Sequence, residues 1–114
     1  MNKNKLNSTV KTITDLLSQK AYWHLEKLSN GISLTAKELK QAVTDYGQTI
    51  IILPEQEYED LDIIEVKDEE PKQWSVNVPV FTEEEGKSDL TLELTFIDTP
   101  TDLYKIEIDG LHVL

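Results

Sequence analysis

The sequence predicts an α+β protein in which N-terminal helices pack on one face of an antiparallel meander sheet. Residues 1–47 carry apolar side chains at helical spacing, and residues 48–114 carry them at alternating positions. The 114 residues show no internal repeat and no low-complexity linker, which is typical of a single domain, 1–114. One version of this fold is a curved sheet wrapped around a helix, as in cystatin-like or NTF2-like proteins.

The helical part predicts two helices. The first carries one apolar stripe, made of Leu6, Val10, Ile13, Leu17, Ala21, Leu25 and Leu28. The spacing leaves open whether this helix breaks near residues 18–19, and Asn30-Gly31 favours a stop. The second helix begins after Thr35, which forms a capping box with Glu38, and it ends at Gly47.

The sheet part begins with a short strand or buried connector. The expected segments are residues 49–53, followed by strands in 61–66, 74–80, 90–96 and 104–108. Residues 54–60 are expected to form an acidic loop, and residues 98–102 a turn. Pro79 cannot donate a ladder hydrogen bond, so its strand lies at an edge of the sheet or is bulged there.

Charge is the strongest compositional signal. The net charge is −11, every basic residue is Lys, and no cysteine is present. Residues 1–53 hold seven Lys and four acids, whereas residues 54–114 hold four Lys and eighteen acids. A surface of this kind attracts a basic protein, although solubility alone also explains acidity. It argues against direct nucleic-acid binding and against an anionic membrane surface.

The sequence carries no recognisable catalytic or metal-binding motif. His24 and His112 have no sequence-near ligand or catalytic partner, and structural or surface roles are expected for both. The acids of residues 55–62 lack the spacing of a calcium loop. A paired-acid hydrolase stays open in principle, but nothing distinguishes one pair of acids from the others. We therefore expect no enzymatic activity, no cofactor and no metal.

The acidic segment 82–89 is the leading candidate for partner binding. It joins two well-patterned strands, and it is longer than a tight hairpin needs. A solvated turn with Gly86 at its bend is the simpler reading. The functional reading is an acidic prong for basic side chains, formed by Glu83, Glu84, Glu85, Lys87 and Asp89.

Glu93 and Glu107 join these candidates through strand register. Shifts in steps of two keep the apolar faces aligned, so Glu93 is expected opposite Glu107 or opposite Lys105. Opposed glutamates destabilise a sheet by several tenths of a kcal/mol, a cost that a cationic partner removes.

The C-terminal motifs carry a resemblance. The segments TEEEGKSDLTLEL and IEIDGLHVL resemble those of an uncharacterised family of small bacterial proteins, over roughly residues 40–114. That family often has Arg where this chain has Lys87, and Asp where it has Gly110. Its members are similar to immunity proteins of toxin–immunity systems such as contact-dependent growth inhibition. The resemblance implies that six residues matter for fold or for binding: Glu83, Glu84, Glu85, Lys87, Ser88 and Asp89.

The prediction that follows is a cytoplasmic, non-catalytic binding protein. Its expected partner is a basic protein, in the favoured case a toxin with a nuclease domain that this chain neutralises. Two alternatives stay open: an adaptor or regulatory subunit with a non-toxin partner, and a small-ligand-binding curved-sheet domain.

Overall fold

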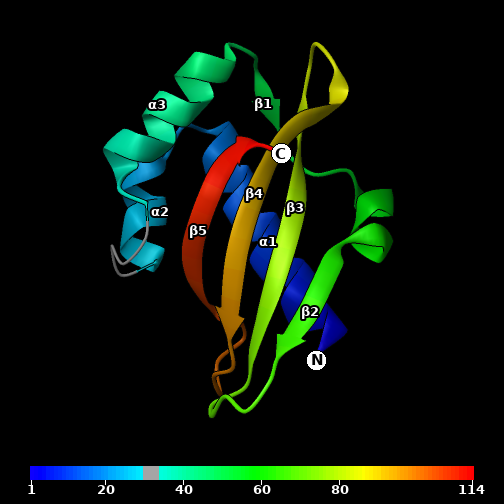
Figure 1. The fold of residues 1–114 in the computed structure, drawn as a ribbon. Coiled ribbons are helices and arrows are strands. Elements are labelled where there is room, and N and C mark those ends of the chain that lie inside the picture. The colour runs from blue at the N-terminus through cyan, green and yellow to red at the C-terminus, as the bar shows by residue number, and fades with distance from the viewer. Residues whose placement is uncertain (30–33) are drawn as a thin grey trace.

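The chain folds into a layer of helices against an antiparallel sheet, which confirms the predicted α+β class (Figure 1). The computed structural model describes residues 1–29 and 34–114, so the helix stop predicted at Asn30-Gly31 lies outside the described residues. Within them the elements are α1 (Lys3–Ser18), α2 (Tyr22–Leu28), α3 (Ala36–Tyr46), β1 (Ile50–Ile51), the 3-10 helix η1 (Glu55–Asp60), β2 (Asp62–Val66), β3 (Gln73–Thr82), β4 (Gly86–Ile97) and β5 (Lys105–Val113).

Helix α1 buries the predicted apolar stripe. Leu6, Val10, Ile13 and Leu17 are each at most 1% exposed. The Asn2 side chain caps the helix by accepting a hydrogen bond from the Lys5 N–H, at 3.0 Å. The helix ends at Ser18, and Lys20 takes a left-handed conformation with φ of 61° before α2 begins. The break that the spacing left open is therefore real.

Helix α3 follows its local signals. Thr35 accepts from the Glu38 N–H, and the Glu38 side chain accepts from the Thr35 N–H, which completes the predicted capping box. Gly47 ends the helix with φ of 77°, a conformation that a residue with a Cβ adopts only at a cost. Local chemistry alone thus sets both ends of this helix.

The sheet order within the described residues is β1-β3-β4-β5, with β2 also paired to β3. Strand β2 pairs with the first half of β3, up to Asn77, and β1 pairs with Phe81 and Thr82. Pro79 lies between these two pairings, so no strand on that side needs a hydrogen bond from the N–H that proline lacks. The β3–β4 register also shifts between Pro79 and Phe81. Of the two predictions for Pro79, the bulge is confirmed.

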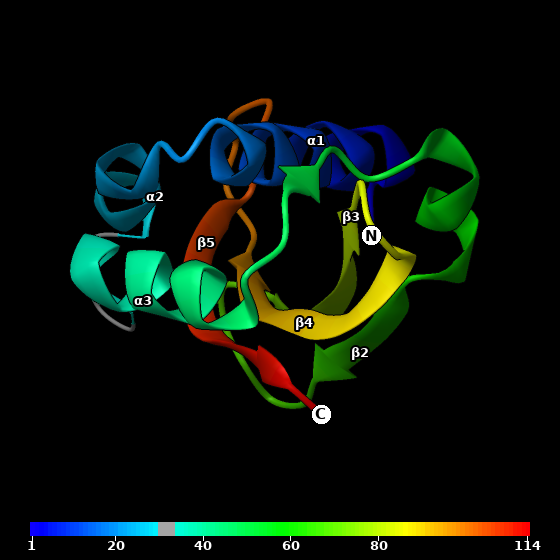
Figure 2. The same ribbon diagram turned by 90° about the horizontal axis from the view of Figure 1, so that it is seen from above.

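The core lies between α1 and the concave face of the sheet. Figure 2 shows the sheet curving around α1, with α2 and α3 beside β5. Val76, Phe96 and Ile108, from three neighbouring strands, are each 0% exposed. Burying side chains of this size contributes about 1.5–3 kcal/mol each. Helix α1 therefore occupies the concave face of the sheet.

Candidate functional site

The three consecutive glutamates form the tip of a tight hairpin. Thr82 pairs with Gly86, so the loop is only three residues long, and Gly86 closes it with φ of 73°. Lys87, Ser88 and Asp89 already belong to β4. The predicted longer loop over residues 82–89 is therefore wrong, because strand pairing continues almost to the glutamates.

Two of these glutamates make hydrogen bonds within the chain. The Glu84 carboxylate accepts hydrogen bonds from the Thr49 N–H and the Thr49 hydroxyl, both at 2.9 Å. These bonds, the backbone one foremost, hold the pKa of Glu84 below its usual range. Glu85 accepts from the Tyr46 hydroxyl at 2.6 Å. Both carboxylates thus fasten the hairpin to the α3–β1 connection, whereas Glu83 is exposed and makes no side-chain bond within the described residues.

Residues at the base of the hairpin also contact other parts of the chain. The backbone N–H of Asp89 donates to the Tyr46 hydroxyl at 3.2 Å. The Lys87 ammonium lies 3.9 Å from a carboxylate oxygen of Glu57 in η1. Of the predicted prong, the side chains of Glu83 and Asp89 are left exposed for a partner, together with much of Lys87.

Glu93 does not face Glu107 or Lys105, so the predicted registers are wrong. Glu93 lies opposite Gly110, and Glu107 lies opposite Thr95. The physical reason is the β4–β5 connection, which extends to Tyr104 because the Tyr104 N–H donates to the Thr9 hydroxyl of α1, at 3.0 Å. The longer connection moves the register by two residues, and the irregularity between Glu93 and Leu94 moves it by one more, so the like-charge argument for this pair is removed.

Glu93 instead contacts His112, a pairing that the sequence did not predict. The two side chains approach to 2.8 Å between Oε1 and Nε2. They come together diagonally, since His112 lies opposite Thr91 and the register shifts next to Glu93. A Cβ at Gly110 would lie 2.8 Å from the same Glu93 oxygen, so the missing side chain makes room for the contact. Both partners sit on the convex face, partly exposed to solvent.

The largest concentration of charge lies on η1, β2 and the turn after it. Residues 55–70 hold nine acids and one Lys, a net charge of −8, and we call this segment the acidic edge. Its ion pairs within the described residues are Glu59 with Lys3, at 3.3 Å, and Glu57 with Lys87. Of residues 54–60, expected to form a loop, Glu55–Asp60 form η1, in which Tyr58 is buried. The sequence shows the acids of residues 55–62 but does not single them out as a partner-binding site, because the position of β2 in the sheet depends on strand order.

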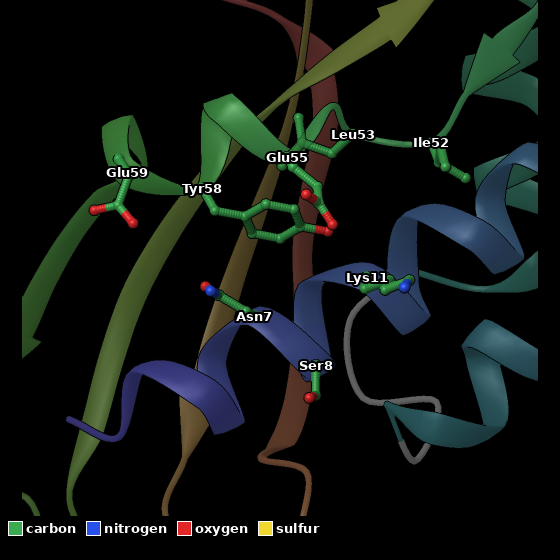
Figure 3. A pocket seen from close by; sticks show the side chains of 8 residues that line it. All are labelled: Asn7, Ser8, Lys11, Ile52, Leu53, Glu55, Tyr58 and Glu59. Carbon is green, nitrogen blue, oxygen red and sulfur yellow. The ribbon is translucent and has the colours of Figure 1, made fainter.

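A cavity of about 400 Å³ opens between α1 and η1 (Figure 3). The Tyr58 ring crosses it above Asn7, whose Oδ1 is buried without a hydrogen-bond partner among the described residues. Burial, and secondarily the nearby Glu55 carboxylate, raises the pKa of Tyr58. Lys11 and the Lys3–Glu59 pair balance the acids here, so the cavity has little preference for either sign of charge.

Across residues 1–29 and 34–114, no three His, Cys, Asp or Glu side chains are grouped so as to hold a metal ion. No helix in that part of the chain has the length and apolar character needed to cross a bilayer.

Comparison with known proteins gives one match. Residues 14–114 match the family described as Domain of unknown function (DUF7668), a match that includes most of the helical part. No curated protein and no solved structure matches the chain.

Proposed function

We propose that this chain, which belongs to the DUF7668 family, is a non-catalytic protein that binds a basic partner protein. The function of the family is unknown, so the support comes from the surface of the chain. The observation that carries the proposal is the acidic edge, with its net charge of −8 over sixteen residues. A field of this strength accelerates encounter with a basic surface and raises specificity more than affinity.

The favoured form of the partner is a toxin that this chain neutralises. The support is the resemblance of the segments around Glu83–Asp89 and residues 106–114 to small proteins similar to immunity proteins. Such inhibitors are commonly acidic because many of their targets are basic nucleases. Under this proposal the charge sets the association rate, and close charge-assisted hydrogen bonds set the dissociation rate.

The test is affinity capture from lysate of the source cells with a tagged wild-type chain and two charge-matched variants. The edge variant is Asp60→Asn, Asp62→Asn and Glu65→Gln. The control is Asp15→Asn, Asp45→Asn and Asp102→Asn, which removes three acids outside the acidic edge. Both variants spare Glu84 and Glu85, because neutralising these would loosen the hairpin instead of testing binding.

The proposal predicts one basic protein that the wild type and the control retain and that the edge variant loses. Equal loss in both variants would reduce the effect to net charge, and no retained protein would contradict the proposal. Identity as an immunity protein then requires that the captured protein be toxic when produced alone and harmless when produced with this chain. A non-toxic partner would instead support the adaptor role.

A second candidate is small-ligand binding, and the cavity beside Tyr58 favours it. Asn7 Oδ1 is a buried acceptor without a hydrogen-bond donor among the described residues. A buried acceptor in this state lowers folding stability by about 1–3 kcal/mol, so a ligand that donates a hydrogen bond to it gains affinity. A fraction of a small-molecule extract that raises the melting temperature of the wild type but not of Asn7→Leu would support this role. Equal shifts in both proteins would count against it.

A further inference from the structure

Strand β2 presents a backbone edge that no other strand covers. Within the described residues β2 pairs with β3 on one side only, and the sheet order places nothing beyond it. Figure 2 shows β2 at the far side of the sheet from α2 and α3. The backbone groups along this edge are therefore available to pair with an added strand.

The same strand exposes apolar side chains. Ile64 is 62% exposed and Val66 is 37% exposed. They lie opposite Ser75 and Gln73, which share the convex face, whereas Ile63 and Glu65 face the other side. An incoming strand would thus meet free backbone groups and, on one face, two apolar side chains spaced by two residues.

Charge selects the occupant of this edge. A second copy of the chain would bring two acidic edges together, each with a net charge of −8, and like charges across a strand pair are destabilising. A strand rich in Lys or Arg gains attraction at the same place. The edge is therefore protected against self-association and open to a basic segment.

We propose that β2 extends its sheet by taking up an extended segment of a basic partner, a mode of recognition known as β-augmentation. Matching the five residues of β2, this segment is about five residues long, and it alternates apolar with basic side chains. The apolar ones pack beside Ile64 and Val66 on the convex face, and the basic ones lie on the opposite face, where β2 presents Glu65. This inference rests on the proposed function, because it identifies how the same acidic edge would hold its partner.

The experiment uses a defined probe, the acetylated and amidated peptide Lys-Val-Lys-Val-Lys-Val-Lys. The matched control is this peptide with every backbone nitrogen methylated, which keeps charge and side chains but cannot donate backbone hydrogen bonds. Binding is measured by calorimetry, and amide hydrogen exchange is followed along the chain. We expect slowed exchange within residues 62–66 and binding at least about tenfold weaker for the methylated peptide, the equivalent of one or two lost hydrogen bonds.

A protein variant gives an independent arm. Ile64→Ser should weaken binding of the unmodified peptide about tenfold, whereas Ile52→Ser, which changes another exposed isoleucine outside β2, should leave the binding unchanged. Equal binding of both peptides without protection of β2 would overturn the proposal and leave attraction by charge alone. Dimerisation of the free protein through β2, seen by light scattering, would overturn it in favour of a second copy.

The two proposals fail differently. A basic protein captured from lysate that leaves the β2 amides unprotected would refute strand addition and spare the proposed function. Peptide binding at β2 without any captured protein would support strand addition and count against the proposed function.

Discussion

Thr9 lies on the buried face of α1, and its hydroxyl connects the helix to the sheet. The hydroxyl donates to the Lys5 carbonyl at 2.7 Å and accepts from the Tyr104 N–H at 3.0 Å, and Thr9 itself is 2% exposed. Thr9→Val keeps the shape of the side chain but leaves the Tyr104 N–H buried without a partner. Such a loss costs about 1–3 kcal/mol, while the Lys5 carbonyl keeps its helical hydrogen bond.

The expected change in melting temperature follows from chain length. For 114 residues the unfolding entropy near the transition is about 240 cal/mol/K, so each kcal/mol lowers the midpoint by about 4 °C. Thr9→Val should therefore melt about 4–12 °C below the wild type in calorimetry. The matched control is Thr12→Val on the same helix, whose hydroxyl bonds to the Ser8 carbonyl in solvent and should cost less than about 0.5 kcal/mol. Equal small shifts for both variants would refute the role assigned to Thr9.

Three further predictions concern the hairpin and the convex face. The pKa of Glu84 is lowered in the folded state, so its contribution to folding stability is present above the usual glutamate pKa and is lost as pH falls through the lower folded pKa. Between pH 7 and pH 3, Glu84→Gln should therefore lose less stability against urea than the wild type. Parallel losses in the two proteins would contradict this. Gly86→Ala should cost about 1 kcal/mol through its positive φ alone, since a Cβ there meets nothing within 4 Å, and an unchanged urea midpoint would count against that reading. Gly110→Ala should displace the Glu93–His112 contact, visible as shifted His112 side-chain NMR signals, while stability stays within about 1 kcal/mol; unshifted signals would be the contrary result.

Local chemistry explains what could be predicted from the sequence. The capping box at Thr35, the helix end at Gly47 and the alternating apolar strands are encoded within a few residues, and all three predictions are confirmed. The class of fold follows from these elements, because a half-apolar sheet needs a layer of helices on one face.

Non-local contacts explain what could not be predicted. The register of Glu93 depends on the length of the β4–β5 connection, where the Thr9–Tyr104 hydrogen bond joins residues 95 positions apart, and on the register shift next to Glu93. The internal use of Glu84 and Glu85 depends on Thr49 and Tyr46, whose approach requires the complete fold. The charge of the sequence indicated an acidic protein, but strand order decides that β2, which lies between the acidic η1 and the acidic turn at residues 68–70, is at the edge of the sheet.

The most direct test of the central claim is the association rate with the captured partner, measured at about 0.05 M and about 0.5 M salt. The account predicts that the wild-type rate falls tenfold or more with salt, as electrostatically steered association does. It also predicts that the edge variant at Asp60, Asp62 and Glu65 starts slower at low salt and depends less on it, while the control variant behaves more like the wild type. Identical salt dependence in the wild type and the edge variant would contradict the claim that the acidic edge recognises the partner.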